Sequence, residues 1–522
     1  MDVPTNRLAR VSERTAWWIA IAVLVIFGAL LRLKGLHSPL LDHPGWRQGD
    51  TAAIARNFAT LQYNIFYPQT DYNGPPPNYV ELELQIVPFL AATLYKIFGV
   101  HEVFGRLISL CFGLGTIVVV GAFARRLFRS TVAGVAAAAV YTILPGAIYY
   151  SRTFMPDTAM VFFFTAAIYA CARWFWDEGE HSWRGFPAAA LLLMLAFLAK
   201  PVALVAIVPV AAASIERFGW LGTLRRLQTY ALLAVALVPL AVYQKVVGSH
   251  AEWHWASGIM QKHVIPSLQG AFSGGPAFWQ KLGSFRHAIG MLWDTMLGPV
   301  GLVLLIAGFF VPMRRREGAL LYSWLGGSLL YIYVVVTVER VDYYMYVVLP
   351  PAALVAGNLC ARAWLWLRPH PWRNAGIALA ALLYVTMTYV DRKRIAPYYA
   401  YNKSNYADAK ALDANLPKET LIVMGHYDPS ILYYINRKGW EEDPYIWTPF
   451  DEQSAIRKGA RYFISIEHKR LKHNVELYAW LARFPVIESR RWPVYDTEYA
   501  KMLPGAEARW RAFRRKEKAG GE

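Results

Sequence analysis

Residues 40–58, LLDHPGWRQGDTAAIARNF, form the stretch around which the rest of the chain is arranged. The stretch follows the first long hydrophobic run, yet its charged residues keep it out of lipid. Asp50 ends a Gly-Asp turn, and the following TAAIARNFATL has a helical pattern, so the spacing predicts that Asp50 caps a helix. A carboxylate at such a junction, held over a membrane surface, also suits a general base for a lipid-linked substrate. The stretch alone leaves both interpretations open.

The composition is that of a membrane protein. Hydrophobic residues make up 56% of the 522 positions and charged residues 17%. The net charge of +18 is expected in cytoplasmic loops, and no basic run interleaved with aromatic residues predicts nucleic-acid binding. The basic N-terminus leads into an apolar run without a cleavage site, which predicts an anchor. All three cysteines fall inside apolar runs, so we expect neither a disulfide nor a cysteine metal site.

About eleven apolar runs are candidates for helices that cross a bilayer, a distance that takes roughly 20 residues. The runs are residues 16–33, 104–123, 132–150, 158–176, 186–199, 202–214, 230–246, 291–313, 320–336, 345–363 and 375–390. Arginine clusters lie between them, and cytoplasmic loops collect Lys and Arg. These clusters are Arg125, Arg126 and Arg129; Arg217, Arg225 and Arg226; Arg314, Arg315 and Arg316; and Arg362, Arg368 and Arg373.

Placing all these clusters inside the cell forces an alternating path. The apolar stretch 82–98 then cannot be a full span, and we predict a helix at the outer interface instead. Glu81, Glu83 and Lys96 would occupy its water-facing positions. A real span at 82–98, with the charge rule broken elsewhere, is the alternative.

The tail after Asp391 has a different composition and lies outside on this path. Its segments LIVMG, DPSILYYINRK, ARYFISI and PVIESRRWPVY alternate strand and helix periods, which predicts a small soluble α/β domain. The sequence therefore predicts an all-α polytopic membrane domain over residues 1–391, with interfacial helices besides the transmembrane ones. Residues 392–522 would form an extracytoplasmic α/β domain.

Two further outer loops carry single charges at the membrane edge. Asp157, in YYSRTFMPDTAMVFF, is expensive there unless it is solvated, paired or functional. A helix N-cap after Pro156 is an equally good interpretation, and Arg152 is a candidate partner. Lys200, in FLAKPVAL, either snorkels to the surface or holds an anionic phosphate as a point charge.

The late segment VERVDYYMYVVLPP places five polar residues at another outer edge: Glu339, Arg340, Asp342, Tyr343 and Tyr344. Tyrosines at that depth usually anchor a helix, and the arginine beside them suits a phosphate. The histidines do not have the spacing of metal ligands. The sequence also contains no Walker loop, no dinucleotide glycine fingerprint and no G-x-S-x-G elbow.

These segments together resemble a known family. The Asp50 loop, a proline-rich stretch, LAATLYKIFGVHEVFGRLISL, YYSRTFMPD, LAKPVAL and RVDYYMYVVLPP follow one another as in the family-39-type GT-C membrane glycosyltransferases. That group contains the protein O-mannosyltransferases and the bacterial aminoarabinose transferases of lipid A. The likeness extends to about residue 350. The first loop departs from the family pattern, in which an acidic pair precedes an RYAEIAR-like helix: here IAR stands at 54–56, and Asp42 rivals Asp50 for the same role.

The resemblance implies an inverting transfer from a polyprenyl-phosphate sugar to a hydroxyl of a lipid, glycan or protein. It places the enzyme in a bacterial inner membrane with its active site outside. Asp50 is then the base and Asp157 orients the acceptor or the base, while the cationic side chains replace a divalent metal, so that no cofactor or metal is expected. The expected substrate-binding residues are Asp42, His43, Trp46, Arg47, Arg152, Lys200, Arg340, Tyr343 and Tyr344.

Two other classes of function fit part of the sequence. A transporter or flippase of lipid-linked sugars should show paired halves with broken helices, and no internal repeat is visible. A scaffold whose C-terminal domain binds a partner would tolerate loss of both Asp50 and Asp157.

Overall fold

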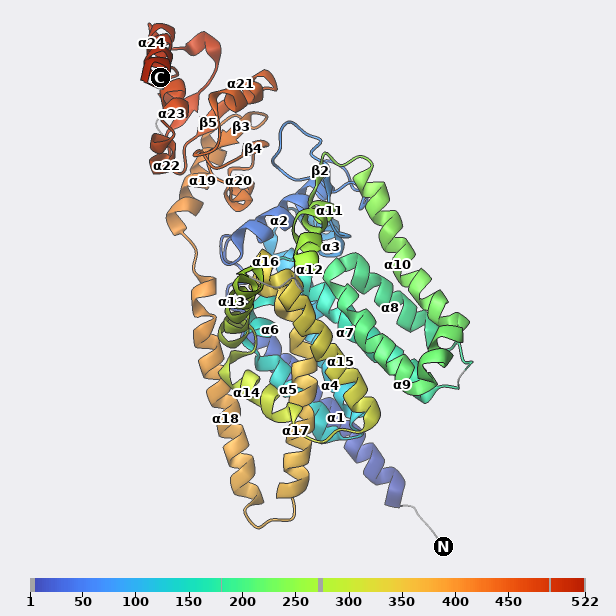
Figure 1. Ribbon diagram of the computed structural model, residues 1–522. Coiled ribbons are helices and arrows are strands. Elements are labelled where there is room, and N and C mark those ends of the chain that lie inside the picture. Colours follow the sequence, from blue (N-terminus) through green and yellow to red (C-terminus); the bar gives the residue numbers. More distant parts are fainter. Residues whose placement is uncertain (1–4, 180, 271–275, 488–489, 521–522) are drawn as a thin grey trace.

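The computed structural model describes residues 5–179, 181–270, 276–487 and 490–520. A bundle of helices carries an α/β unit on one end, and the chain begins at the other (Figure 1). We call the end that carries helix α2 (Gly45–Thr60) and the α/β unit the sheet end. The opposite end, where Arg125, Arg126, Arg129 and Arg316 lie together, is called the basic end.

Hydrophobic runs of the predicted positions form the bundle. Its helices are α1 (Thr5–Arg32), α4 (Glu102–Leu127), α5 (Thr131–Ile143), α6 (Pro145–Tyr150), α7 (Asp157–Asp177), α8 (Phe186–Ala199), α9 (Ile207–Arg225), α10 (Leu227–Gly248), α13 (Pro276–Met291), α14 (Gly298–Phe309), α15 (Arg315–Tyr331), α17 (Leu349–Leu367) and α18 (Arg373–Arg394). Within the described residues, 8 helical segments are long and apolar enough to cross a membrane. The runs at α5 and α8 form shorter apolar helices of 13 and 14 residues.

The predicted run 291–313 is not one straight helix. A break at Leu297 bends the segment Trp279–Met296 against α14 by 113°. Gly298 forms the corner with φ +68°, and a Cβ at this position would collide with Asp391 of α18. Only glycine satisfies both the left-handed backbone and the close approach. Hydropathy does not show such a corner, because both arms are apolar.

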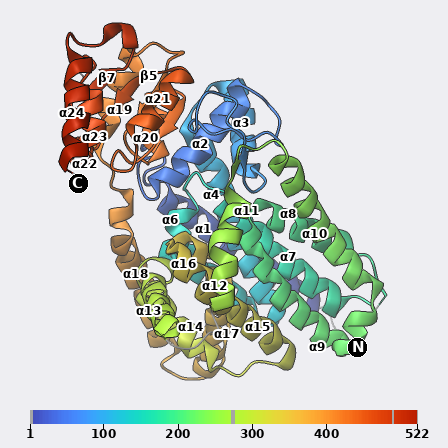
Figure 2. The same cartoon turned by 45° about the horizontal axis from the view of Figure 1, so that its top comes forward.

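The predicted interfacial segment forms α3 (Ile86–Phe98), which lies beside α2 at the sheet end (Figures 1 and 2). Lys96 is exposed, as expected. The prediction for Glu81 and Glu83 is wrong, because both are 5% exposed. The chain after α10 folds back over this segment, so that β2 (Trp253–His254) pairs in parallel with β1 (Val80–Glu81).

The remaining short elements of the bundle connect its helices near the sheet end. They are η1 (Pro201–Ala206), α11 (Trp255–Ile259), η2 (Met260–Val264), α12 (Ile265–Gly270), η3 (Leu292–Met296), η4 (Ile332–Val336), α16 (Thr337–Glu339), η5 (Asp342–Val348) and η6 (Ala396–Tyr399). Together they bring loops that are far apart in the sequence to one end of the bundle (Figure 1).

The C-terminal segment contains a five-stranded sheet of order β4-β3-β5-β7-β6. Its strands are β3 (Leu421–Met424), β4 (Gly439–Glu441), β5 (Ala460–Ile464), β6 (Val486–Ile487) and β7 (Val494–Asp496), of which β4, β3 and β5 are parallel and β7 is antiparallel to both neighbours. Its helices are α19 (Lys403–Asn415), α20 (Pro429–Ile435), α21 (Pro449–Arg457), α22 (His468–His473), α23 (Val475–Leu481), α24 (Ala506–Gly520) and the short η7 (Tyr499–Lys501). The predicted alternation of strands and helices is present. The domain boundary at residue 391 stays a prediction.

The α/β unit packs directly on α2 through α20 (Figure 2). A Cβ at Gly49 of α2 would lie 2.5 Å from the Cα of Ser430, so glycine permits the two helices to touch. The Arg56 guanidinium donates to the Tyr433 carbonyl at 3.1 Å, and Gly74 bridges to Gly439 of β4. The sheet therefore closes over the helix that carries Asp50.

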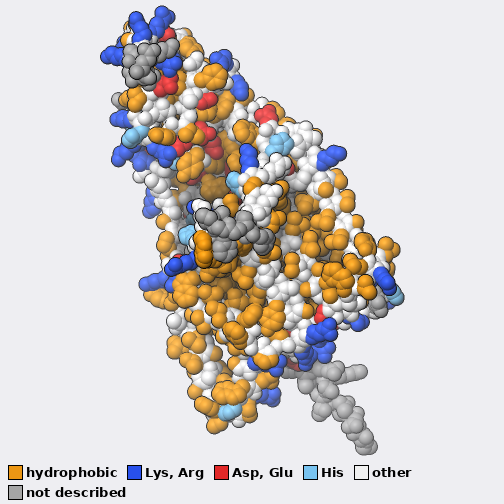
Figure 3. Space-filling view, viewed as in Figure 1, with side chains coloured by type: hydrophobic (Ala, Val, Ile, Leu, Met, Phe, Trp, Pro, Cys, Tyr) orange, Lys and Arg blue, Asp and Glu red, His pale blue; other side chains and the backbone are white. Residues whose placement is uncertain are grey.

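The surface follows this division. Hydrophobic side chains cover most of the bundle face seen in Figure 3, while Lys and Arg gather on the α/β unit and along the lower edge of the bundle. Such an apolar band between charged rims suits helices that lie in a bilayer.

Candidate active site

Asp50 lies inside α2 rather than at its start. The helix begins at Gly45, with Pro44 in the N-cap position, and Asp50 is its sixth residue. The predicted N-cap role is therefore wrong. The Gly-Asp pair resembles a turn signal, but Gly49 here serves the close contact with Ser430.

The carboxyl group of Asp50 is held in an unusual environment. The residue is 6% exposed, and its Oδ1 has no hydrogen-bond partner. Burial raises the pKa of Asp50 to about 7, although the charge of Arg47 and a hydrogen bond from Tyr72 act in the opposite direction. A carboxyl with this pKa can accept a proton near neutral pH.

Arg47 links Asp50 to the neighbouring acids. Its guanidinium forms an ion pair with Glu83 and interacts electrostatically with Asp50, Asp157 and Tyr343. Glu83 stands next to α3, so the pair joins the start of α2 to the interfacial segment. A buried guanidinium needs such a partner, because an unpaired buried charge is costly.

Lys200 and Asp157 form a second buried pair. The Lys200 Nζ donates to Asp157 Oδ1 at 2.6 Å and lies 4.6 Å from the Tyr344 ring centroid. Because Lys200 is 6% exposed, the snorkelling interpretation is wrong. Asp157 is the first residue of α7 and makes no capping bond, and its Oδ2 has no hydrogen-bond partner.

Asp42 is the centre of a separate ion-pair network. Its Oδ1 accepts from the Arg106 Nη2 at 2.9 Å and from the Gln48 amide at 2.8 Å, and its Oδ2 pairs with Arg152. All three charged side chains are fully buried. The suggested pairing of Arg152 with Asp157 is therefore wrong, since Asp42 takes this guanidinium instead.

A third group of polar side chains surrounds Asp342. Its Oδ1 accepts from the Tyr150 hydroxyl at 2.6 Å and lies 3.4 Å from the His43 Nε2. The His43 ring also stacks on Tyr398, with 4.0 Å between the ring centroids. The predicted residue His43 thus belongs to this group, which borders the Asp42 network through Tyr149.

Two predicted residues lie at the margin of these groups. Trp46 is 41% exposed on α2. Arg340 is exposed, has φ +54°, and lines another hollow together with His287 and Gln280. The structure does not bring Arg340 to Lys200.

An apolar cavity of about 200 Å³ opens beside the Lys200–Asp157 pair. Its polar side chains are Glu83, Lys200, Tyr331 and Tyr344. The rest of the wall is Pro201, Val202, Leu204, Val205, Ala256, Ile259, Met260, Val264 and Val335. Such a cavity suits a ligand that has an apolar chain and an anionic group. The chain would lie along the apolar wall, and the anionic group would contact Lys200.

Sequence reasoning missed four residues of the site: Glu83, Tyr72, Tyr331 and Asp342. The sequence predicts that Glu83 faces water, because it precedes an apolar helix. Its partner Arg47 is 36 residues away in the sequence, so no local pattern indicates the pair. Asp342 was visible as an acid beside the tyrosines of VDYYMY, yet nothing in that segment indicates Tyr150 as its partner.

Part of the chain matches a known protein family, and its fold matches solved structures. Residues 85–243 match the family described as dolichyl-phosphate-mannose-protein mannosyltransferase. The structure of ArnT from Cupriavidus metallidurans bound to undecaprenyl phosphate aligns with 94% of this chain and 99% of that chain, at 14% identity and a TM-score of 0.59. The chain has the GT-C fold.

A second structure supports the same fold. The archaeal oligosaccharyltransferase AglB from Archaeoglobus fulgidus, in complex with an inhibitory peptide and a dolichol-phosphate, aligns with 94% of this chain and 75% of that chain. The identity is 14% and the TM-score is 0.56. No curated protein matches the chain in sequence. The resemblance to the GT-C glycosyltransferases of the mannosyltransferase and ArnT type is thereby confirmed.

Proposed function

We propose that the protein is an inverting glycosyltransferase that moves a hexosyl or pentosyl group from a polyprenyl-phosphate donor to a hydroxyl acceptor. The observation that carries the proposal is the apolar cavity ending at Lys200, Glu83 and Tyr344. Arg47 connects this cavity to the buried carboxyl of Asp50, because it pairs with Glu83 and interacts electrostatically with Asp50. The polyprenyl chain would follow the apolar wall, and the phosphate would meet Lys200. ArnT and AglB, which share the fold, were each solved with a lipid phosphate of this class.

In this reaction the acceptor oxygen attacks the anomeric carbon as the bond to the phosphate oxygen breaks. Asp50 takes the acceptor proton, which its raised pKa permits near neutral pH. The departing phosphate gains negative charge, and the Lys200 ammonium stabilises it where water is excluded. Asp157 holds that ammonium through its 2.6 Å hydrogen bond.

The contacts of Asp42 support Asp50 as the base. Arg106 and Arg152 occupy both oxygens of Asp42, and all three side chains are fully buried. Neither oxygen of Asp42 is therefore free to meet the hydroxyl of an acceptor. Arg152 is likewise committed to Asp42, so we assign it a structural role rather than a phosphate contact.

A transporter of lipid-linked sugars is the alternative, and it would need broken helices in paired halves. Among the described helices one pair is sharply bent, at Gly298, and no second one matches it. The charged groups lie on α2, at the first residue of α7 and directly after α8, and the Arg47–Glu83 and Lys200–Asp157 pairs are among them. These features favour the transferase.

Purified protein should be incubated with a panel of polyprenyl-phosphate sugars and hydroxyl acceptors, and the products analysed by mass spectrometry. We expect transfer with one donor and release of the polyprenyl phosphate. A preparation that binds these donors and moves them across proteoliposomes, without releasing the phosphate, would instead establish the transporter.

We also propose that the sheet end faces the extracytoplasmic side of a bacterial inner membrane. The arginines of the basic end support this orientation, because cytoplasmic loops collect positive charge. A reporter joined after Tyr401, between α18 and α19, should behave as extracytoplasmic. Cytoplasmic activity of that fusion would reverse the orientation.

A further inference from the structure

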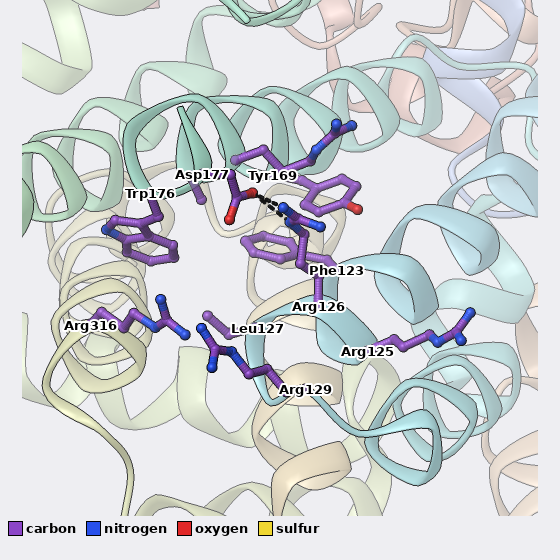
Figure 4. Close-up of a pocket in the computed structure, with 11 residues that line it drawn as sticks. Phe123, Arg125, Arg126, Leu127, Arg129, Tyr169, Trp176, Asp177 and Arg316 are labelled. Carbon is purple, nitrogen blue, oxygen red and sulfur yellow. Dashed lines mark hydrogen bonds and ion pairs between the residues drawn. The ribbon is translucent and has the colours of Figure 1, made fainter. Parts of the chain in front are cut away.

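Arginines converge on a hollow of about 280 Å³ at the basic end, far from the catalytic groups (Figure 4). The hollow lies between α4, α7 and the start of α15, and we call it the arginine pocket. Its lining residues are Phe123, Arg125, Arg126, Leu127, Arg129, Tyr169, Ala172, Arg173, Trp176, Asp177 and Arg316. One acid thus stands among five cations.

That acid is already engaged. The Arg126 Nε donates to Asp177 Oδ2 at 2.6 Å, and Figure 4 shows this pair in the middle of the pocket. Arg125 points away and meets Glu13 at 4.0 Å. In the described part of the chain Arg129, Arg173 and Arg316 form no ion pair, so positive charge remains uncompensated here.

Two of these three guanidinium groups, those of Arg129 and Arg316, face one another. Figure 4 shows Arg129 and Arg316 reaching toward each other from separate elements. Arg316 lies over the Trp176 ring with 5.9 Å to the centroid, and Arg173 lies at the same distance from Tyr169. Aromatic walls thus hold the arginines in place, although like charges repel at such a site unless an anion lies between them.

The backbone positions of Arg316 and Arg129 are also unfavourable for these two residues. Arg316 is the second residue of α15, where the helix dipole is positive and disfavours a cation. Arg129 follows the end of α4 with φ +51°, a conformation in which glycine is usual. An anion bound beside Arg316 would offset the unfavourable charge at the start of α15.

We propose that the arginine pocket binds the phosphodiester headgroup of an anionic phospholipid. The shared chemistry is a phosphate oxygen held by guanidinium groups, which bind it in a bidentate manner. The lipid is favoured over a free anion because Phe123, Leu127 and Trp176 give the pocket an apolar side at the ends of membrane-crossing helices. Basic pockets between such helices are the usual headgroup sites.

The test uses the full-length protein in a neutral detergent and native mass spectrometry with phosphatidylglycerol, phosphatidylcholine of the same acyl chains, or inorganic phosphate. The variant Arg129→Gln/Arg316→Gln removes two facing cations. Arg225→Gln/Arg368→Gln is the matched control, since both residues are exposed and neither forms an ion pair within the described ranges. Arg129→Lys/Arg316→Lys keeps the charge.

We expect phosphatidylglycerol to bind the wild type more tightly than phosphatidylcholine. The glutamine pair should weaken phosphatidylglycerol binding at least about tenfold, the lysine pair less, and the control pair less than twofold. Should the glutamine pair fail to fold, Arg316→Gln alone carries the test. Equal affinity for both lipids, equal loss in the control pair, or displacement of the lipid by millimolar inorganic phosphate would each overturn the assignment.

Discussion

Buried charges at the sheet end are paired, whereas arginines at the basic end outnumber their acids. At the sheet end Glu83 accompanies Arg47, Asp157 accompanies Lys200, and Asp42 lies between two arginines. The arginine pocket holds a single acid, Asp177. The difference follows from the access of water to the charged groups. An unpaired charge is tolerated at an open rim, where water solvates it, but not in an enclosed site.

Asp50 departs from this pairing, which makes the comparison useful. It is enclosed like its neighbours, yet its Oδ1 lacks a partner and its pKa is raised. Polar groups that break the local pairing rule in this way are candidates for chemistry rather than for stability.

The largest expected effect is on stability, from Asp42→Asn. This change leaves Arg106 and Arg152 buried beside a neutral amide, and breaking a buried pair costs about 3–5 kcal/mol. The thermal unfolding temperature in detergent should fall sharply, while turnover per folded molecule stays within a few-fold of wild type. Full stability together with lost turnover would make Asp42 the base and contradict the assignment made here.

Asp50→Asn should have the opposite profile. We expect turnover at saturating donor to fall on the order of 10²-fold or more, because the amide cannot accept a proton. Expression should stay close to wild type. Asp428→Asn is a useful control, because Asp428 caps α20 and raises the pKa of Asp50 without being assigned to the reaction. Unchanged turnover in Asp50→Asn would remove the proposed mechanism.

Lys200→Ala should weaken donor binding or turnover about tenfold, the usual loss for one charge-assisted contact of 1.5–3 kcal/mol. It also leaves Asp157 unpaired, so Lys200→Arg separates the loss of charge from the loss of shape. Lys245→Ala, at an exposed position of α10, should change nothing. Comparable kinetics for Lys200→Ala and Lys245→Ala would return Lys200 to a structural role.

The raised pKa of Asp50 also predicts a pH dependence. Because the pKa of Asp50 is raised to about 7, kcat/KM should increase with pH and level off above that value. The folded protein binds this proton more tightly than the unfolded chain, so Asp50 lowers the free energy of unfolding progressively between about pH 4 and 7. Asp50→Asn should therefore gain thermal stability relative to wild type at pH 8 and not at pH 4. If the difference in thermal stability between Asp50→Asn and wild type did not change with pH, Asp50 would have an ordinary pKa.

Hydropathy predicted most of the fold because each span is a continuous segment whose environment depends on its own residues. The runs at α1, α4, α7 and α10 appear near their predicted positions. The strands at Leu421–Met424 and Ala460–Ile464 were likewise visible from their periods. The corner at Gly298 was not, because it depends on a contact with a distant helix.

Candidate site residues could be selected from the sequence, but their contacts could not be predicted. Asp50, Asp157 and Lys200 could be selected because charges at membrane edges are rare. Their partners could not, since Lys200 lies 43 residues from Asp157 and Arg152 lies 110 from Asp42. Local spacing carries no information about contacts at such separations.

The contact between Gly49 and Ser430 has a consequence for biosynthesis. Helix α2 leaves the ribosome long before α20, and until Ser430 packs on Gly49 one side of α2 remains open to water. Without that cover the carboxyl of Asp50 is solvated and keeps its ordinary acidity. The raised pKa of the proposed base therefore depends on a segment that is synthesised long after α2.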